Sequence, residues 1–133
     1  MRSAQSHKAS GLYAHLTWHT WRRQPSITAS DVPLISSAIH QASSFRRVRV
    51  HALSVLSDHV HVLVSYSPAV SLAPFIRHAK SESSRRLNLT GHSGLLFQWA
   101  RGYYAGSLSR SHIDLARVYL ARQHAHHPGL IPK

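Results

Sequence analysis

The sequence predicts an α+β fold in which helices pack on one face of a mostly antiparallel sheet. Apolar residues alternate with polar ones in some segments and recur every three or four residues in others, which distinguishes strands from helices. These segments follow one another in the order β-α-β-β-α-β-α. A chain of 133 residues without cysteine is long enough for one core. We therefore expect a ferredoxin-like or RNA-recognition-like β-α-β-β-α-β sandwich with an added C-terminal helix, whose sheet keeps its other face free for binding.

The first half of the chain predicts a strand, a helix and two further strands. Residues 12–21 alternate as a strand, and the sequence "RRQPS" at 22–26 predicts a turn. A helix is expected after Ser30 as its N-cap. Its apolar stripe at helical spacing comprises Val32, Ile35, Ile39, Ala42 and Phe45. Residues 46–56 and 59–66 are then predicted to be two strands joined by "SD".

The second half predicts a helix, a loop, a strand and a last helix. Ser71 is expected to start the helix, whose stripe comprises Leu72, Phe75, Ile76, Ala79, Ser83 and Leu87. Residues 88–95 are rich in Gly, Asn and Ser and predict a loop. Residues 96–109 predict a glycine-interrupted strand. The last helix is expected to begin near Ser111 and to end before "HHPG" at 126–129.

We expect residues 1–11 to form a flexible tail and residues 12–133 to form one domain. The chain contains no apolar run of about 18 residues that could cross a bilayer. These features predict a soluble, cytoplasmic protein.

The charge balance is strongly basic. Sixteen Lys and Arg residues against four acids give a formal net charge of +12, and most of the cations are arginine. Arginine pairs with phosphate bidentately, so the composition favours a nucleic-acid partner over a membrane surface or a solvated face without a partner. Only Asp31, Asp58, Glu82 and Asp114 are acidic. So few carboxylates make a two-metal nuclease built on acidic ligands improbable.

Two histidines, His59 and His61, stand one residue apart in the predicted strand "HVHVLVSY". Residues i and i+2 of a strand share a face, so both imidazoles can converge on one metal ion, although a structural or solvent-facing pair is the alternative. Asp58 either points to the opposite face, orients an imidazole or lies in the turn. Tyr119 and Gln123 are four residues apart and present a hydroxyl and an amide oxygen on one helix face.

Four motifs now stand in order, "SDHVHVLVS", "FIRHAKSESSRRLN", "FQWARGYYAGSLS" and "RVYLARQHAHH". Together they resemble the IS200/IS605-like single-tyrosine transposases of the HUH endonuclease superfamily, including their REP-associated relatives. The resemblance covers residues 12–127. It implies that His59 and His61 bind a divalent metal, Mg²⁺ or Mn²⁺, with Gln123 as third ligand. It also implies that Tyr119 attacks single-stranded DNA, leaving a 5'-phosphotyrosine and a free 3'-hydroxyl that can be rejoined.

The resemblance further implies a substrate with imperfect hairpins and a homodimer. The residues that we expect to contact DNA phosphates are Arg22, Arg23, Arg77, Lys80, Arg85, Arg86 and Arg101. A non-catalytic nucleic-acid-binding module on the same fold is the alternative function, and a domesticated enzyme that cleaves chromosomal repeat hairpins is another.

Several aromatic and histidine residues leave alternatives open. Trp18, Trp21 and Trp99 either stack on bases or fill the core. Tyr103 and Tyr104 are rival nucleophiles, and His15 and His19 form either an extra metal site or ordinary hydrogen-bonded histidines.

Overall fold

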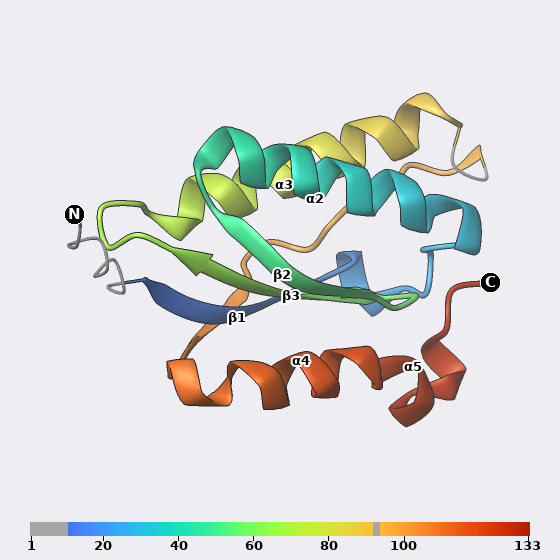
Figure 1. Cartoon of the computed structure of the whole chain (residues 1–133). Coiled ribbons are helices and arrows are strands. Elements are labelled where there is room, and N and C mark those ends of the chain that lie inside the picture. Colours follow the sequence, from blue (N-terminus) through green and yellow to red (C-terminus); the bar gives the residue numbers. More distant parts are fainter. Residues whose placement is uncertain (1–10, 92–93) are drawn as a thin grey trace.

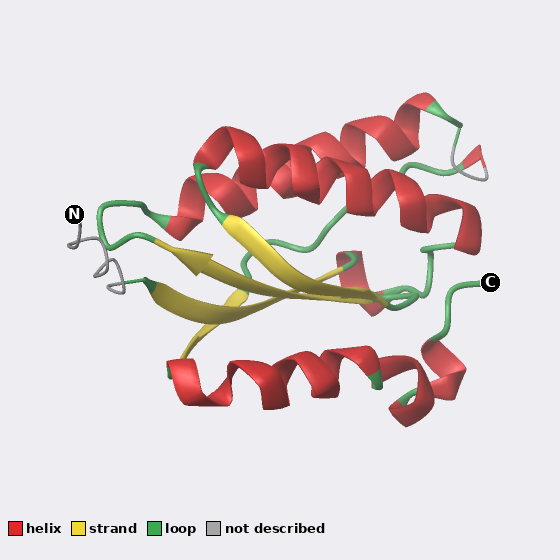
Figure 2. Cartoon of the chain, viewed as in Figure 1, coloured by secondary structure: helices red, strands yellow, loops and turns green. Residues whose placement is uncertain are grey.

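The computed structural model describes residues 11–91 and 94–133 as a four-stranded antiparallel sheet between helices (Figures 1 and 2). The strand order is β2-β3-β1-β4. The strands are β1 (Leu12–His19), β2 (Arg49–Val55), β3 (His59–Tyr66) and β4 (Tyr104–Leu108). Helices α2 (Val32–Arg46) and α3 (Leu72–Leu89) cover one face, while α4 (Ile113–Ala121) and α5 (Gln123–His126) lie along the other. The predicted α+β sandwich is confirmed, but the second face is not free, because α4 lies across it.

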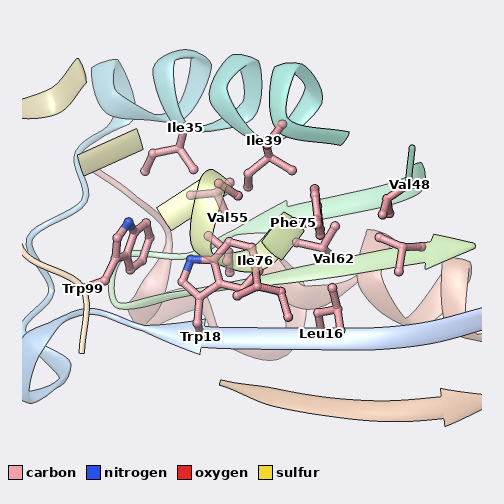
Figure 3. Packing of buried hydrophobic residues seen from close by; sticks show 14 of the residues in the cluster. Leu16, Trp18, Ile35, Ile39, Val48, Val55, Val62, Phe75, Ile76 and Trp99 are labelled. Carbon is pink, nitrogen blue, oxygen red and sulfur yellow. The ribbon is translucent and has the colours of Figure 1, made fainter. Parts of the chain in front are cut away.

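The core lies between the sheet and the α2–α3 pair. Alternation along β1 and β3 turns Leu16, Trp18 and Val62 toward these helices, where they meet Ile39 and Phe75 (Figure 3). All five side chains are fully buried. Burying side chains of this size contributes roughly 1.5–3 kcal/mol each. The side chains that alternate with these along β1 and β3 therefore point to the other face of the sheet, toward α4.

The start of α2 differs from the prediction. A short 3-10 turn (Ala29–Asp31) precedes the helix, and the Asp31 carboxylate accepts hydrogen bonds from the backbone N–H and the hydroxyl of Thr28, both at 2.8 Å. Thr28 caps this turn and Asp31 is the N-cap of α2, so Ser30 is not the capping residue. Asp31 stabilises the turn through these hydrogen bonds. Its negative charge also interacts favourably with the positive end of the helix dipole.

The end of α2 corrects two further predictions. Phe45 is 71% exposed, because it lies about 90° from the middle of the buried stripe in the last turn of the helix. Its ring packs edge-on against His78 at 5.4 Å between centroids. The helix continues to Arg46, and Arg47 has a left-handed backbone (φ 62°). The next strand consequently begins at Arg49 instead of residue 46.

The predicted strand at 96–109 is regular only over β4. Phe97 and Trp99 are buried in an irregular segment whose single bridge joins Thr20 to Trp99. The side chain of Asn88 bonds both backbone groups of Phe97, accepting from its N–H at 2.7 Å and donating to its carbonyl at 3.1 Å. Gly102, at φ +80°, then turns the chain into β4. A side-chain amide thus takes the place of a strand partner for Phe97, while Gln98 and Ala100 bond the backbone at the end of β1 and just after it.

The C-terminal helix is broken. A 3-10 turn (Arg110–His112) leads into α4, and Arg122 (φ −100°, ψ 7°) separates α4 from α5. Apart from Gly11, the predicted tail lies outside the described residues. In the part of the chain that the structure describes, no helix is long and apolar enough to cross a membrane.

Candidate metal centre and tyrosine

The two histidines of β3 face α4 across the sheet from the core. In the register of β1 and β3, His59 is paired with His19 and His61 with Thr17, so these four side chains share the α4 face. His59 and His61 are 8% and 9% exposed. Their Nε2 atoms are 3.1 Å apart. The predicted convergence of the two imidazoles is therefore present in the structure.

Asp58 orients the first imidazole. Its Oδ1 lies 2.6 Å from Nδ1 of His59, and both side chains are largely buried. The carboxylate accepts the Nδ1 proton of His59, which leaves Nε2 with its lone pair directed at His61. Thr20 donates its backbone N–H to the Asp58 carbonyl at 2.9 Å and fixes the turn. Because β3 begins only at His59, Asp58 is free of strand alternation and reaches this face.

The second imidazole is contacted from β1. Nδ1 of His61 lies 2.8 Å from Nε2 of His15 and 3.3 Å from the Thr17 hydroxyl. Burial lowers the pKa of His61 to about 3, and the nearby His59 and His15 rings lower it in the same direction. His61 is therefore neutral at physiological pH, which is the protonation state that a metal ligand requires.

Helix α4 brings Tyr119 over the histidines. The Tyr119 ring lies edge-on to His61 at 6.4 Å between centroids and to His126 at 6.0 Å, and the tyrosine is 46% exposed. Gln123 follows one turn later and is fully buried. Its Nε2 donates to the Tyr119 carbonyl at 3.2 Å, whereas its Oε1 is buried without a partner. A half-exposed phenol thus stands beside His61, and a buried amide oxygen without a partner follows it one helical turn later.

These donors fit a divalent cation. Two adjacent ligands of an octahedral ion with bonds of about 2.0–2.1 Å lie about 3 Å apart, close to the separation of the two Nε2 atoms. The orphaned Gln123 oxygen is a third acceptor of the kind that Mg²⁺ and Mn²⁺ bind. Among the described residues, no three His, Asp or Glu side chains gather into a metal site.

The predicted DNA-contacting arginines lie on both sides of the sheet. Arg22 and Arg23 lie in a 3-10 turn (Trp21–Arg23) shortly after β1, both are exposed, and both have left-handed backbones (φ 55° and 53°). The Arg22 guanidinium lies 5.4 Å from the centre of the exposed Trp21 ring. Arg77 on α3 and Arg101 before β4 are also exposed.

The remaining cations have partners within the chain. Arg85 and Arg86 both donate to Glu82, and these hydrogen bonds hold the pKa of the Glu82 carboxyl at about 2. Arg86 also contacts Ser37 and Gln41 of α2. The Lys80 ammonium donates to the carbonyls of Ala100 and Gly102. DNA contacts by all seven of the predicted residues stay predictions.

The structure settles the alternatives for the tryptophans. Trp18 and Trp99 are core residues, 0% and 8% exposed, and only Trp21 presents its ring to solvent. His15 joins the histidine cluster through its 2.8 Å contact with His61, while an extra metal site at His15 and His19 stays a prediction. Its two-residue offset from Thr17 could have indicated the shared face, but the contact with His61 depends on the pairing register of β1 and β3.

Comparison with known proteins identifies the family. The sequence model of the family described as "Transposase IS200 like" matches residues 8–123. This chain belongs to the IS200-like transposase family. No curated protein sequence matches this IS200-like transposase.

Solved structures share the fold of this IS200-like transposase. A candidate transposase from Deinococcus radiodurans R1 aligns with a TM-score of 0.68 and 21% identity, over 85% of this chain and 91% of that chain. A REP-associated tyrosine transposase bound to a REP hairpin aligns with a TM-score of 0.72 and 15% identity, over 89% of this chain and 69% of that chain. The sheet and its helices are thus an architecture found in other transposases.

Proposed function

We propose that this IS200-like transposase is a metal-dependent endonuclease and strand transferase for single-stranded DNA. The observation that carries the proposal is the convergence of the His59 and His61 Nε2 atoms, 3.1 Å apart, beneath the half-exposed Tyr119 ring. The orphaned oxygen of Gln123 supplies the third donor. A basic chain with these groups matches the chemistry of a phosphodiester better than that of any neutral substrate.

The phenol of Tyr119 is the nucleophile in this proposal. Its oxygen forms a bond to the scissile phosphorus, the bond from phosphorus to the 3'-oxygen breaks, and a 5'-phosphotyrosine results. The phenol proton passes to solvent, and the departing 3'-oxygen takes up a proton. Attack by a 3'-hydroxyl on the phosphotyrosine reverses these steps and joins the strand without a nucleotide cofactor.

Residues of the cluster divide the supporting tasks. His59, His61 and Gln123 would hold Mg²⁺ or Mn²⁺, which when bound polarises the phosphate and lowers the demand on a phenol whose ordinary pKa is about 10. Asp58 keeps the lone pair of His59 Nε2 directed into the site. Burial keeps His61 neutral by lowering its pKa.

Hairpin-containing DNA is the proposed substrate. One structural neighbour is a transposase bound to a REP hairpin, and this chain shares its fold. The exposed Arg22 and Arg23 lie in the turn that follows β1, whose last residue, His19, pairs with His59. They are suited to hold phosphates on either side of the scissile bond.

Covalent adduct formation tests the proposal. We would incubate the protein with labelled single-stranded hairpins from the DNA flanking its gene, with Mg²⁺, Mn²⁺ or EDTA, and run denaturing gels. We expect a labelled protein band that requires metal and is absent for Tyr119→Phe, while Tyr66→Phe serves as a control that keeps it. Tight binding without an adduct under any metal would favour the non-catalytic binding module.

A further inference from the structure

Two consecutive tyrosines mark the edge of the sheet. Tyr103 and Tyr104 are 48% and 59% exposed where the chain enters β4, the outermost strand beside β1. Tyr104 pairs with Thr17 in the register, so it faces the histidines, and its ring lies edge-on to His15 at 6.2 Å. Tyr103, as the preceding residue, lies on the side of α3. The two rings therefore stand on opposite sides of one edge.

A groove lies beneath Tyr103 on the α3 side. Its volume is about 530 Å³, within the range of small-ligand sites. Residues from one stripe of α3 and from the segment before β4 line it, and none of them is acidic. The polar members are Arg77, Lys80, Ser81, Ser84, Gln98 and Tyr103. The groove thus offers a guanidinium, hydroxyl groups and an aromatic ring together, which suits a phosphate with an attached base.

The groove is preformed rather than a gap between loose segments. The Lys80 ammonium donates to the carbonyls of Ala100 at 2.8 Å and Gly102 at 2.9 Å, tying the outer wall to α3. The indole of Trp99, which also lines the groove, donates to the Ser83 hydroxyl at 2.9 Å. Because the walls of the groove are fixed in this way, a ligand that binds there does not have to order them, which lowers the entropic cost of binding.

We propose that this groove holds nucleotides of the same DNA strand whose scissile phosphate lies at Tyr119. The strand would cross the β4 edge, with one base stacked on Tyr103 in the groove and another on Tyr104 near the histidines. Arg77 binds a phosphate on the groove side. This inference rests on the proposed function, and it gives the chain a second DNA contact across the sheet from the catalytic cluster.

Binding of fluorescein-labelled dT20, followed by anisotropy in a Tyr119→Phe background, tests the groove. Tyr103→Ser should weaken binding about five- to tenfold, and Tyr103→Phe should stay within about twofold, because only the ring is needed for stacking. Arg77→Ala should lower the salt slope by about 0.7. The matched control Arg46→Ala removes an exposed arginine that does not line the groove and should leave that slope nearer to the parent's.

Parent-like binding of dT20 by both Tyr103→Ser and Arg77→Ala would overturn the inference, as would tighter binding of rU20 than of dT20. Both residues are exposed, so we expect both variants to fold, and circular dichroism melting checks this. The adduct assay separates the two proposals. If the wild-type protein forms no adduct yet Tyr103→Ser weakens dT20 binding, the proposed cleavage is wrong and the groove proposal holds. If the wild type forms an adduct and the groove variants bind dT20 like the parent, the cleavage proposal holds and the groove proposal is wrong.

Discussion

At the scale of single residues, the site depends on lone pairs held in place by their neighbours. His59 directs Nε2 toward His61 because its other ring nitrogen is engaged by Asp58 at 2.6 Å. Without a cation, two such lone pairs 3.1 Å apart repel, unless one ring carries its proton between them. The buried oxygen of Gln123, which has no partner, adds to this cost. In the mechanism that we propose, a divalent ion held by His59, His61 and Gln123 would satisfy all three atoms.

Asp58→Ala is expected to weaken Mn²⁺ binding about 10- to 100-fold, because His59 loses the acceptor that fixes its tautomer. Asp58→Asn keeps an acceptor oxygen and should recover part of the affinity. Electron paramagnetic resonance titration of free Mn²⁺ measures both without DNA. Equal affinities for the wild type and Asp58→Ala would show that the carboxylate does not position His59.

Gln123→Leu should separate stability from function. The substitution removes the orphaned oxygen, which relieves about 1–3 kcal/mol, and loses one hydrogen bond to Tyr119, which costs about 1 kcal/mol. We therefore expect a free energy of unfolding in urea with EDTA that is equal to or above that of the wild type, together with weaker Mn²⁺ binding. Destabilisation with unchanged metal affinity would contradict the assignment of Gln123 as a ligand.

At the scale of elements, alternation was enough to predict the histidine face but not its neighbours. The strand around His59 and His61 agrees with the prediction because one face must carry the apolar core. The contact between His15 and His61 depends on long-range pairing, which local patterns do not encode. The strand predicted at 96–109 was too long, because a side chain, Asn88, meets the hydrogen-bonding needs of Phe97 there. The interruption at Arg122 likewise has no Gly or Pro to signal it.

Asn88→Ala is expected to destabilise the protein by about 1–3 kcal/mol, since it removes the two side-chain hydrogen bonds to the partly buried backbone groups of Phe97. Asn88→Asp keeps the acceptor for the Phe97 N–H and should cost less. Urea unfolding followed by tryptophan fluorescence measures the difference. Indistinguishable midpoints for Asn88→Ala and the wild type would mean that water replaces the amide at no cost.

At the scale of the whole molecule, acid should destabilise the fold through its histidines. Burial lowers the pKa of His61 from an ordinary value of 6.5 to about 3, so between these values the unfolded chain binds a proton that the folded chain excludes. The free energy of unfolding should therefore fall as the pH drops from 7 to 5. Urea unfolding in EDTA should show a smaller fall in the free energy of unfolding for His61→Asn than for the wild type. An equal fall in both proteins would assign the effect to other titratable groups. Glu82, with its pKa at about 2, stays ionised in this window.

The position of Tyr119 relative to His61 bears on whether one chain or two chains form each active site. Tyr119 and His61 of one chain already lie together, so we propose that each site is completed within one chain, whether or not the protein forms the predicted homodimer. A mixture of Tyr119→Phe and His61→Ala proteins should then give no adduct. Light scattering of the mixture would report the oligomeric state. Recovery of the adduct on mixing would show that the tyrosine helix serves a partner's histidines.

Mass spectrometry of the DNA-linked peptide after proteolysis is the measurement that bears most on this mechanism. We expect a single modified residue, Tyr119, joined to the 5'-phosphate of the cleaved strand, with a free 3'-hydroxyl on the other fragment. Linkage at Tyr103 or Tyr104, or cleavage that releases an unattached 5'-phosphate, would contradict a mechanism in which Tyr119 attacks a phosphate above the His59 and His61 pair.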